Sequence, residues 1–297
     1  MRSRSPRLWP VVAVLALGVS LLSSGPAPAA PARVTVPTLT SVTARHVGQV
    51  DRVTFGFTNG VPDNVNVAWV DSLVHDGSGR PVRVAGAKVL SVGFNDATAH
   101  DSGGATTRKR TAYPLPNVIT SVMAGDFEGF VTVGLGVQKQ TSYTVTKLHN
   151  PDRVVVDVAA AFPTTARRIW LVDKHAVATG TGAFFVAKHR PVRSDAPAGA
   201  ALNALFAGPT PRERAAGLRL VRSHAWGFDS LQIGGGIARV RLTHGCNSNG
   251  STITVAGEIM PTLRQFPTVD WVKIYAPNGQ TESPSGSSDS IPACLEP

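Results

Sequence analysis

Cysteine, aromatic and charged residues are all scarce in this sequence of 297 residues. Two cysteines and three methionines are present, and 6% of the residues are aromatic. No Cys-x-x-Cys, His-Glu-x-x-His or Gly-x-Ser-x-Gly motif occurs, so the usual signatures of zinc sites, metalloproteases and serine hydrolases are missing. A hydrophobic fraction of 42% with only 16% charged residues is typical of a folded protein and argues against wholesale disorder.

Long apolar runs are absent as well. The clearest run covers residues 11–22, which is too short to cross a hydrocarbon core of about 30 Å. It follows Arg2, Arg4 and Arg7 and precedes a small-residue segment that ends at Ala29. This order is typical of a secretory signal peptide. We therefore predict a signal peptide over residues 1–29, a secreted protein of the cell envelope and no permanent membrane span.

Basic residues outnumber acidic ones. Cleavage after Ala29 removes three arginines and no acid, which lowers the formal charge from +10 to +7. A positive surplus attracts polyanions, and the densest basic run is Arg108-Lys109-Arg110. We predict these three residues as candidate contacts for a cell-wall polymer, against the alternative of a solvated loop. Export and the lack of a recognition motif argue against nucleic acid as a partner.

The cysteines, Cys246 and Cys294, both lie in the second half of the chain. In an oxidising compartment such a pair predicts one disulfide, which would tether a polar tail over residues 277–297. With no Cys-x-x-Cys and no adjacent histidine pair, neither a metal site nor a cofactor is expected.

Residues 38–160 alternate apolar and polar positions with the period of a strand. The apolar residues of three such segments share one face: Val53, Phe55 and Phe57; Val131, Val133, Leu135 and Val137; Val154, Val156 and Val158. Turn-rich clusters separate the segments, so the sequence predicts an antiparallel β-sandwich.

Three segments of this region carry a resemblance to a known family. They are residues 51–55 (DRVTF), 124–136 (AGDFEGFVTVGLG) and 148–158 (LHNPDRVVVDV). In them the region resembles the AMIN-like domain of secreted actinobacterial proteins. The resemblance implies a module that binds the cell wall or localises the protein to it.

Helix signals are clearest in residues 197–218 (PAGAALNALFAGPTPRERAAGL). Pro197 can start a helix whose apolar residues recur at helical spacing, and Gly208 can end it. Thr210 and Glu213 form the pattern of a capping box, which predicts a second, short helix. Glycines 234–236 then separate two segments of a predicted hairpin.

With residues 265–272 (QFPTVDWV), these features resemble the sporulation and germination (GerMN) family over residues 166–276. The resemblance implies an α+β fold similar to ring-building domains of spore-envelope complexes. Residues 161–165 would form a linker between the domains. The family's long helix corresponds to the stripe from Ala256 to Leu263, which contains Pro261, so this helix either kinks or starts later.

Few residues suggest catalysis. Asp126 and Glu128 could mimic a carboxylate pair, although a turn explains them equally well. The neighbours His75-Asp76 and His100-Asp101 point to opposite faces of any strand and lie in polar turns. Aromatic side chains could stack on sugars if exposed, but core packing is the expectation for all of them: Trp69, Phe127, Phe130, Trp226, Phe228 and Trp271.

The sequence thus predicts a non-enzymatic, two-domain envelope protein. The first domain would bind cell-wall polymer, either peptidoglycan or an anionic glycan, and the second would mediate assembly with envelope proteins. Two alternatives remain: an oligomeric ring or scaffold component built of identical copies, and a cryptic wall hydrolase that uses Asp126 or Glu128.

Overall fold

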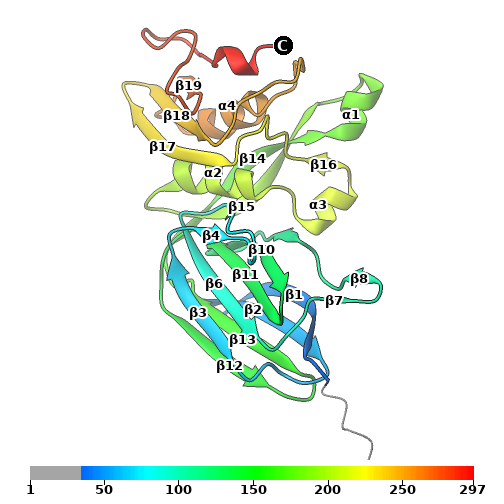
Figure 1. The fold of residues 1–297 in the computed structure, drawn as a ribbon. Coiled ribbons are helices and arrows are strands. Elements are labelled where there is room, and N and C mark those ends of the chain that lie inside the picture. Colours follow the sequence, from blue (N-terminus) through cyan, green and yellow to red (C-terminus); the bar gives the residue numbers. More distant parts are fainter. Residues whose placement is uncertain (1–34) are drawn as a thin grey trace, which may run out of the picture. The chain divides into compact units, whose positions relative to one another are not determined.

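Antiparallel strands with alternating burial form the two sheets of a β-sandwich in the first half of the computed structural model, which describes residues 35–297 (Figure 1). The first sheet has the order β1 (Thr38–Val47), β2 (Val50–Thr58), β13 (Arg153–Ala159), β12 (Tyr143–Leu148). The second has the order β3 (Val65–Val70), β6 (Lys88–Asn95), β11 (Phe130–Val137), β10 (Val118–Phe127), β9 (Arg110–Ala112). Two small hairpins accompany them: β4 (Leu73–Val74) with β5 (Pro81–Val82), and β7 (His100–Asp101) with β8 (Gly104–Ala105).

The sandwich core contains the apolar faces predicted from the alternation. Phe55 and Phe57 of β2 each meet Phe94 of β6 edge to face, with ring centroids 5.1 Å apart. The predicted valines and leucine of β11 and β13 are buried in the same core. The β-sandwich prediction is therefore confirmed.

Two three-stranded sheets and four α-helices make up the second half, which confirms the α+β prediction. One sheet has the order β15 (Phe185–Arg193), β14 (Thr164–Asp173), β16 (Leu218–Arg219), and the other has the order β17 (Gly227–Gly234), β18 (Ile237–Thr243), β19 (Trp271–Tyr275). The helices are α1 (Lys174–Thr179), α2 (Pro197–Ala207), α3 (Pro211–Ala215) and α4 (Ala256–Arg264), followed by the 3₁₀ turn η1 (Ala293–Leu295). β18 and β19 run parallel, with α4 in the connection between them.

The helix boundaries follow the local signals in the sequence. α2 starts at Pro197 and stops at Gly208. The Thr210 side chain accepts a hydrogen bond from the Glu213 N–H, and the Glu213 carboxylate accepts one from the Thr210 N–H, so the capping box is present. α4 begins at Ala256, where the apolar stripe begins, and continues through Pro261 to Arg264. Packing of the buried stripe outweighs the cost of a proline inside the helix.

The predicted linker is partly a strand. β13 extends to Ala159, and β14 begins at Thr164, inside the predicted linker of residues 161–165. Thr164 and Thr165 pair with Arg193 and Val192 of β15. Local composition suggested an extended segment, but only the partner strand decides whether such a segment joins a sheet.

Cys246 and Cys294 form the predicted disulfide, with their Cα atoms 5.6 Å apart. The tail is more than a tethered polar segment, because it packs on Lys273 of β19. The Lys273 side chain is fully buried, and its ammonium donates to the carbonyl oxygens of Ser283 and Ser285. Leu295 is buried in the core of the second domain.

Residues 35–297 form one compact unit, and its core crosses the boundary between the two domains. Ala85, Ala112 and Ile119 of the sandwich belong to the same apolar cluster as α2 and α4. The Gln138 side chain, at the end of β11, donates to the Ala200 carbonyl oxygen of α2 at 3.0 Å. Side chains from distant parts of the sequence therefore meet at this boundary.

Candidate functional site

Two phenylalanine rings stand at the tip of the β10–β11 hairpin. Phe127 and Phe130 are directly paired across the hairpin, and their turn residues, Glu128 and Gly129, both have positive φ. A two-residue turn of this kind matches the twist of the flanking strands. The rings are 52% and 51% exposed, so the expectation that they pack in the core is wrong. Residues opposite each other in a sheet project from the same face, so the rings offer one joint apolar surface.

Other aromatic side chains divide between core and surface. Trp69 packs against the sandwich core and meets Tyr143 edge to face at 6.0 Å, and Phe228 packs against the second core, as expected. Trp226 is half-buried and stacks on His244 with ring centroids 3.5 Å apart. Trp271 is 37% exposed, so its assignment to the core is wrong.

Polar groups lie beside the hairpin tip. His100 pairs with Asp126, at 2.6 Å between Nδ1 and Oδ2, and not with its sequence neighbour Asp101. The other Asp126 oxygen accepts from the Ala99 N–H at 3.0 Å. Because it is engaged on both oxygens, Asp126 holds the β7–β8 loop against β10. Glu128 is exposed in the turn, two residues after Asp126, so the hydrolase alternative stays a prediction.

The loop between β4 and β5 supports the hairpin from one side. The His75 ring bonds to the Ala124 carbonyl oxygen at 2.6 Å, and Asp76 lies against Gly125. A Cβ on Gly125 would come within 1.8 Å of the Asp76 carboxylate, so this contact requires glycine. Gly77 lies next to the Phe127 ring. His75 and Asp76 thus serve the packing of this loop.

The basic run of residues 108–110 lies where β9 begins, with Arg108 and Lys109 before the strand and Arg110 at its first position. Arg108 and Lys109 are exposed, as a role in polymer contact requires. Arg110 is half-buried, and its guanidinium donates to the Arg83 carbonyl oxygen. Arg110 is therefore less accessible than Arg108 and Lys109, and the polymer contact stays a prediction for the run.

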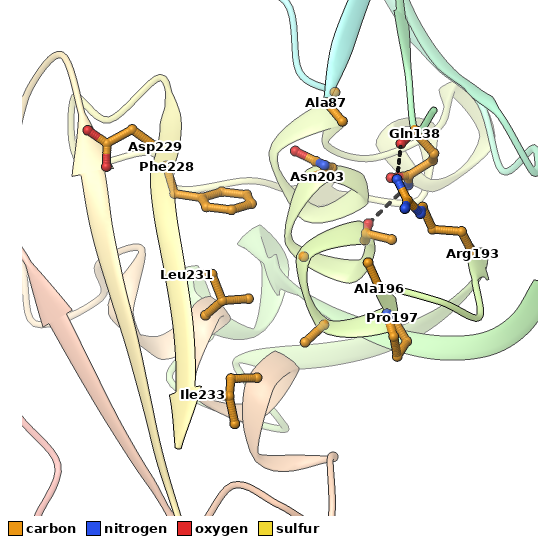
Figure 2. A pocket seen from close by; sticks show the side chains of 14 residues that line it. Ala87, Gln138, Arg193, Ala196, Pro197, Asn203, Phe228, Asp229, Leu231 and Ile233 are labelled. Carbon is orange, nitrogen blue, oxygen red and sulfur yellow. Dashed lines mark hydrogen bonds between the residues drawn. The ribbon is translucent and has the colours of Figure 1, made fainter. Parts of the chain in front are cut away.

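A groove of about 620 Å³ runs between α2 and the edge strand β17 (Figure 2). Phe228, Leu231 and Ile233 of β17 line one wall, and the first turns of α2 line the other. Gln138 also lines the groove, and its backbone carbonyl oxygen accepts a hydrogen bond from Arg193 at 3.2 Å. The Gln138 side-chain oxygen is buried without a partner.

Metal-binding groups do not gather in the part of the chain that the structure describes. Among residues 35–297, no group of three or more histidine, cysteine, aspartate or glutamate side chains is placed to hold a metal ion. No helix among these residues is both long and apolar enough to span a membrane. The predicted signal peptide lies outside the described residues.

Comparison with known families now identifies the two halves. The AMIN-like domain matches residues 37–160, and the family described as "Sporulation and spore germination" matches residues 172–282. The chain therefore contains an AMIN-like domain followed by a GerMN domain. Neither the curated proteins nor the solved structures gave a significant match.

The two family matches and the disulfide indicate the setting in which the chain acts. AMIN-like domains are generally associated with peptidoglycan binding, and together with the Cys246–Cys294 disulfide this indicates an extracytoplasmic protein. The pair of domains indicates a role in the cell envelope or in sporulation. The hairpin tip carrying Phe127 and Phe130 lies in the AMIN-like domain, and the groove of Figure 2 is lined by both domains.

Sequence reasoning missed the exposure of the hairpin tip, although a signal was present. Glu-Gly between two phenylalanines, at the centre of two alternating segments, is the pattern of a tight hairpin turn. Residues that flank such a turn lie at the end of a sheet, where little covers them. The pairing of His100 with Asp126 left no comparable signal, because the two residues are 26 positions apart.

Proposed function

We propose that the chain is a secreted, non-enzymatic protein whose AMIN-like domain binds cell-wall glycan through the β10–β11 hairpin tip. The observation that carries the proposal is the paired, half-exposed phenylalanines, Phe127 and Phe130. Exposed large apolar side chains that adjoin one another mark interaction surfaces more often than isolated ones do. Aromatic faces pack against the apolar faces of sugar rings.

The rim of the hairpin tip supplies groups that suit sugar hydroxyls. Glu128 is exposed in the turn that joins the two phenylalanines, and His100 is exposed beside Asp126. A carboxylate accepts and an imidazole donates or accepts, so both can hydrogen-bond hydroxyl groups. Arg108 and Lys109 add positive charge on the same domain, which favours an anionic glycan.

For the GerMN domain we propose a role in assembly, with a second copy of the chain or another envelope protein. β17 lies at the edge of its sheet, and Ile233 near its end is 38% exposed. An edge strand presents unpaired backbone groups that another strand can pair with. Light scattering on the purified chain measures this directly. A monomer at every concentration that also captures no envelope protein would contradict the assembly role.

Co-sedimentation of the full exported chain with purified cell walls tests the glycan-binding role. Replacing both phenylalanines (F127A with F130A) removes about 2 kcal/mol of stacking and is expected to weaken binding roughly thirtyfold. F184A is the matched control, because Phe184 is an exposed phenylalanine of the GerMN domain. Equal binding by the double variant and by F184A would contradict the proposal.

Salt and product analysis complete the test. Neutralising Arg108 and Lys109 (R108Q with K109Q) is expected to reduce the salt dependence of binding, because exposed charges are screened within about 8 Å at physiological ionic strength. No soluble sugar or peptide fragment is expected from the walls. Fragment release that disappears in D126N or E128Q would show that the chain is a hydrolase instead.

A further inference from the structure

Three arginines from distant parts of the sequence gather at the boundary between the two domains. Arg83 follows β5 and Arg110 begins β9 in the AMIN-like domain, whereas Arg222 follows β16 in the GerMN domain. All three side chains are half-buried. The charge of Arg110 is repelled by both Arg83 and Arg222, and the exposed Arg214 adds a fourth positive charge.

Each of these arginines keeps a buried nitrogen atom without a partner. The unpartnered atoms are Nε of Arg83, one terminal nitrogen of Arg110 and Nε of Arg222. The bonds they do make go to neutral carbonyl oxygens: Arg110 donates to Arg83, and Arg222 donates to Phe206 at 3.5 Å. Within residues 35–297 none of the three forms an ion pair with a carboxylate.

The cluster therefore concentrates positive charge without neutralising it. Burial, and then repulsion from the neighbouring arginines, lowers the pKa of Arg110 to about 9 and that of Arg222 to about 10. The carboxyl group that faces Arg222 is Glu258, which is fully buried. Burial raises the pKa of Glu258 well above its usual range, which limits the negative charge it can offer. Buried charges are ordinarily paired with an opposite charge. Within the described residues, the three arginines therefore lack the anionic partner that such a cluster usually has.

We propose that Arg83, Arg110 and Arg222 form a binding site for a phosphate group at the boundary between the AMIN-like and GerMN domains. Phosphate presents several oxygens in different directions, so it can accept from three guanidinium groups at once. A carboxylate holds its two oxygens in one plane, whereas the four oxygens of a phosphate or phosphodiester are arranged as a tetrahedron and can face donors on several sides. The ligand is either free phosphate or a phosphodiester of an anionic polymer.

A cavity lies beside Arg83 and next to Phe206, whose carbonyl oxygen accepts a hydrogen bond from Arg222. The cavity has a volume of about 260 Å³ and is lined by residues of both domains, among them Arg83, Phe206 and Trp226. A phosphate bound by all three arginines would contact both domains and stabilise their packing. The site shares no residue with the hairpin tip, so it goes beyond the proposed glycan binding and can be tested separately.

Thermal unfolding of the full exported chain in sodium phosphate, compared with sodium chloride at the same ionic strength and pH, tests the site. A ligand that binds the folded state raises the melting temperature with concentration by mass action. We expect a rise specific to phosphate that R110Q and R222Q weaken at least tenfold, since each removes a charge-assisted contact. Calorimetric titration with inorganic phosphate measures the same affinities independently of unfolding.

A control variant and the stability without phosphate complete the test of the arginine site. R80Q is the control, because Arg80 is an exposed arginine three residues before Arg83, and it should respond to phosphate like the parent chain. Without phosphate, R110Q and R222Q should be at least as stable as the parent, because like charges are removed. A phosphate response that equals the chloride response, or that R110Q and R222Q retain in full, would overturn the site.

The same assay distinguishes the two sources of phosphate. Binding of a short glycerol phosphate polymer, lost in R110Q and R222Q, identifies a phosphodiester as the ligand. Binding of inorganic phosphate without the polymer identifies a site for the free ion. Loss of wall binding in the hairpin double variant with an intact phosphate response would separate the two sites.

Discussion

Arg190 of β15 and Glu213 of α3 form a two-point ion pair, with the guanidinium nitrogens 2.8 and 2.5 Å from the two carboxylate oxygens. Arg190 is 4% exposed and Glu213 14%. One Glu213 oxygen also accepts from the Thr210 N–H, so the residue that completes the capping box also fastens α3 to the sheet. Burial alone would raise the pKa of Glu213, but the hydrogen bond and the charge of Arg190 outweigh it and lower the pKa.

The first prediction is that E213Q destabilises the fold by about 3 kcal/mol, because it leaves the buried Arg190 charge unneutralised. Urea unfolding measures the loss. The control is D229N, which breaks the exposed pair between Asp229 and Arg241 and should cost less than about 1 kcal/mol. Equal losses in the two variants would show that the Arg190–Glu213 pair contributes no more than a surface pair.

The second prediction concerns the pH dependence caused by Glu258. Its pKa is raised in the folded state, so above about pH 4.5, the usual value, the unfolded chain releases a proton that the folded chain keeps. The Glu258 contribution to stability is therefore lost as the pH rises from there toward the folded pKa. E258Q cannot titrate and should gain stability relative to the parent chain between pH 4.5 and 7. Urea unfolding of both proteins across this pH range tests the prediction. A stability difference between E258Q and the parent chain that does not change with pH would refute it.

The third prediction concerns the disulfide, which closes a loop between residues 48 positions apart. Replacing both cysteines (C246S with C294S) should cost roughly 4 kcal/mol on the chain-entropy model. Thermal unfolding of the oxidised, the reduced and the double-variant protein measures this loss of stability. The reduced protein and the double variant should have the same melting temperature. Peptide mapping that finds both thiols free in exported protein would contradict the bridge.

The fourth prediction concerns export. Arginines before a short apolar run and small residues up to Ala29 predict cleavage that leaves Ala30 as the new N-terminus. N-terminal sequencing of protein from the medium or the outer envelope checks this. Recovery of the uncleaved chain from the cytosol alone would contradict it.

Local signals in the sequence were sufficient for most of the fold. Proline at the start of α2, glycine at its end and the Thr210–Glu213 box act within a few residues, so the helix boundaries follow from the sequence. The alternation along β2, β11 and β13 likewise predicts which face is buried, because a strand with one apolar face must cover it.

Only the tertiary structure decided which side chains are exposed and which charges meet. Phenylalanine is usually a core residue, but the turn between Phe127 and Phe130 places both rings at the end of a sheet. Arg83, Arg110 and Arg222 come together because the two domains share one core, and no local pattern connects positions so far apart. Helix ends depend on short-range hydrogen bonds and strand faces on periodic burial, and both can be read along the chain. A binding site depends on contacts between elements, which exist only after packing.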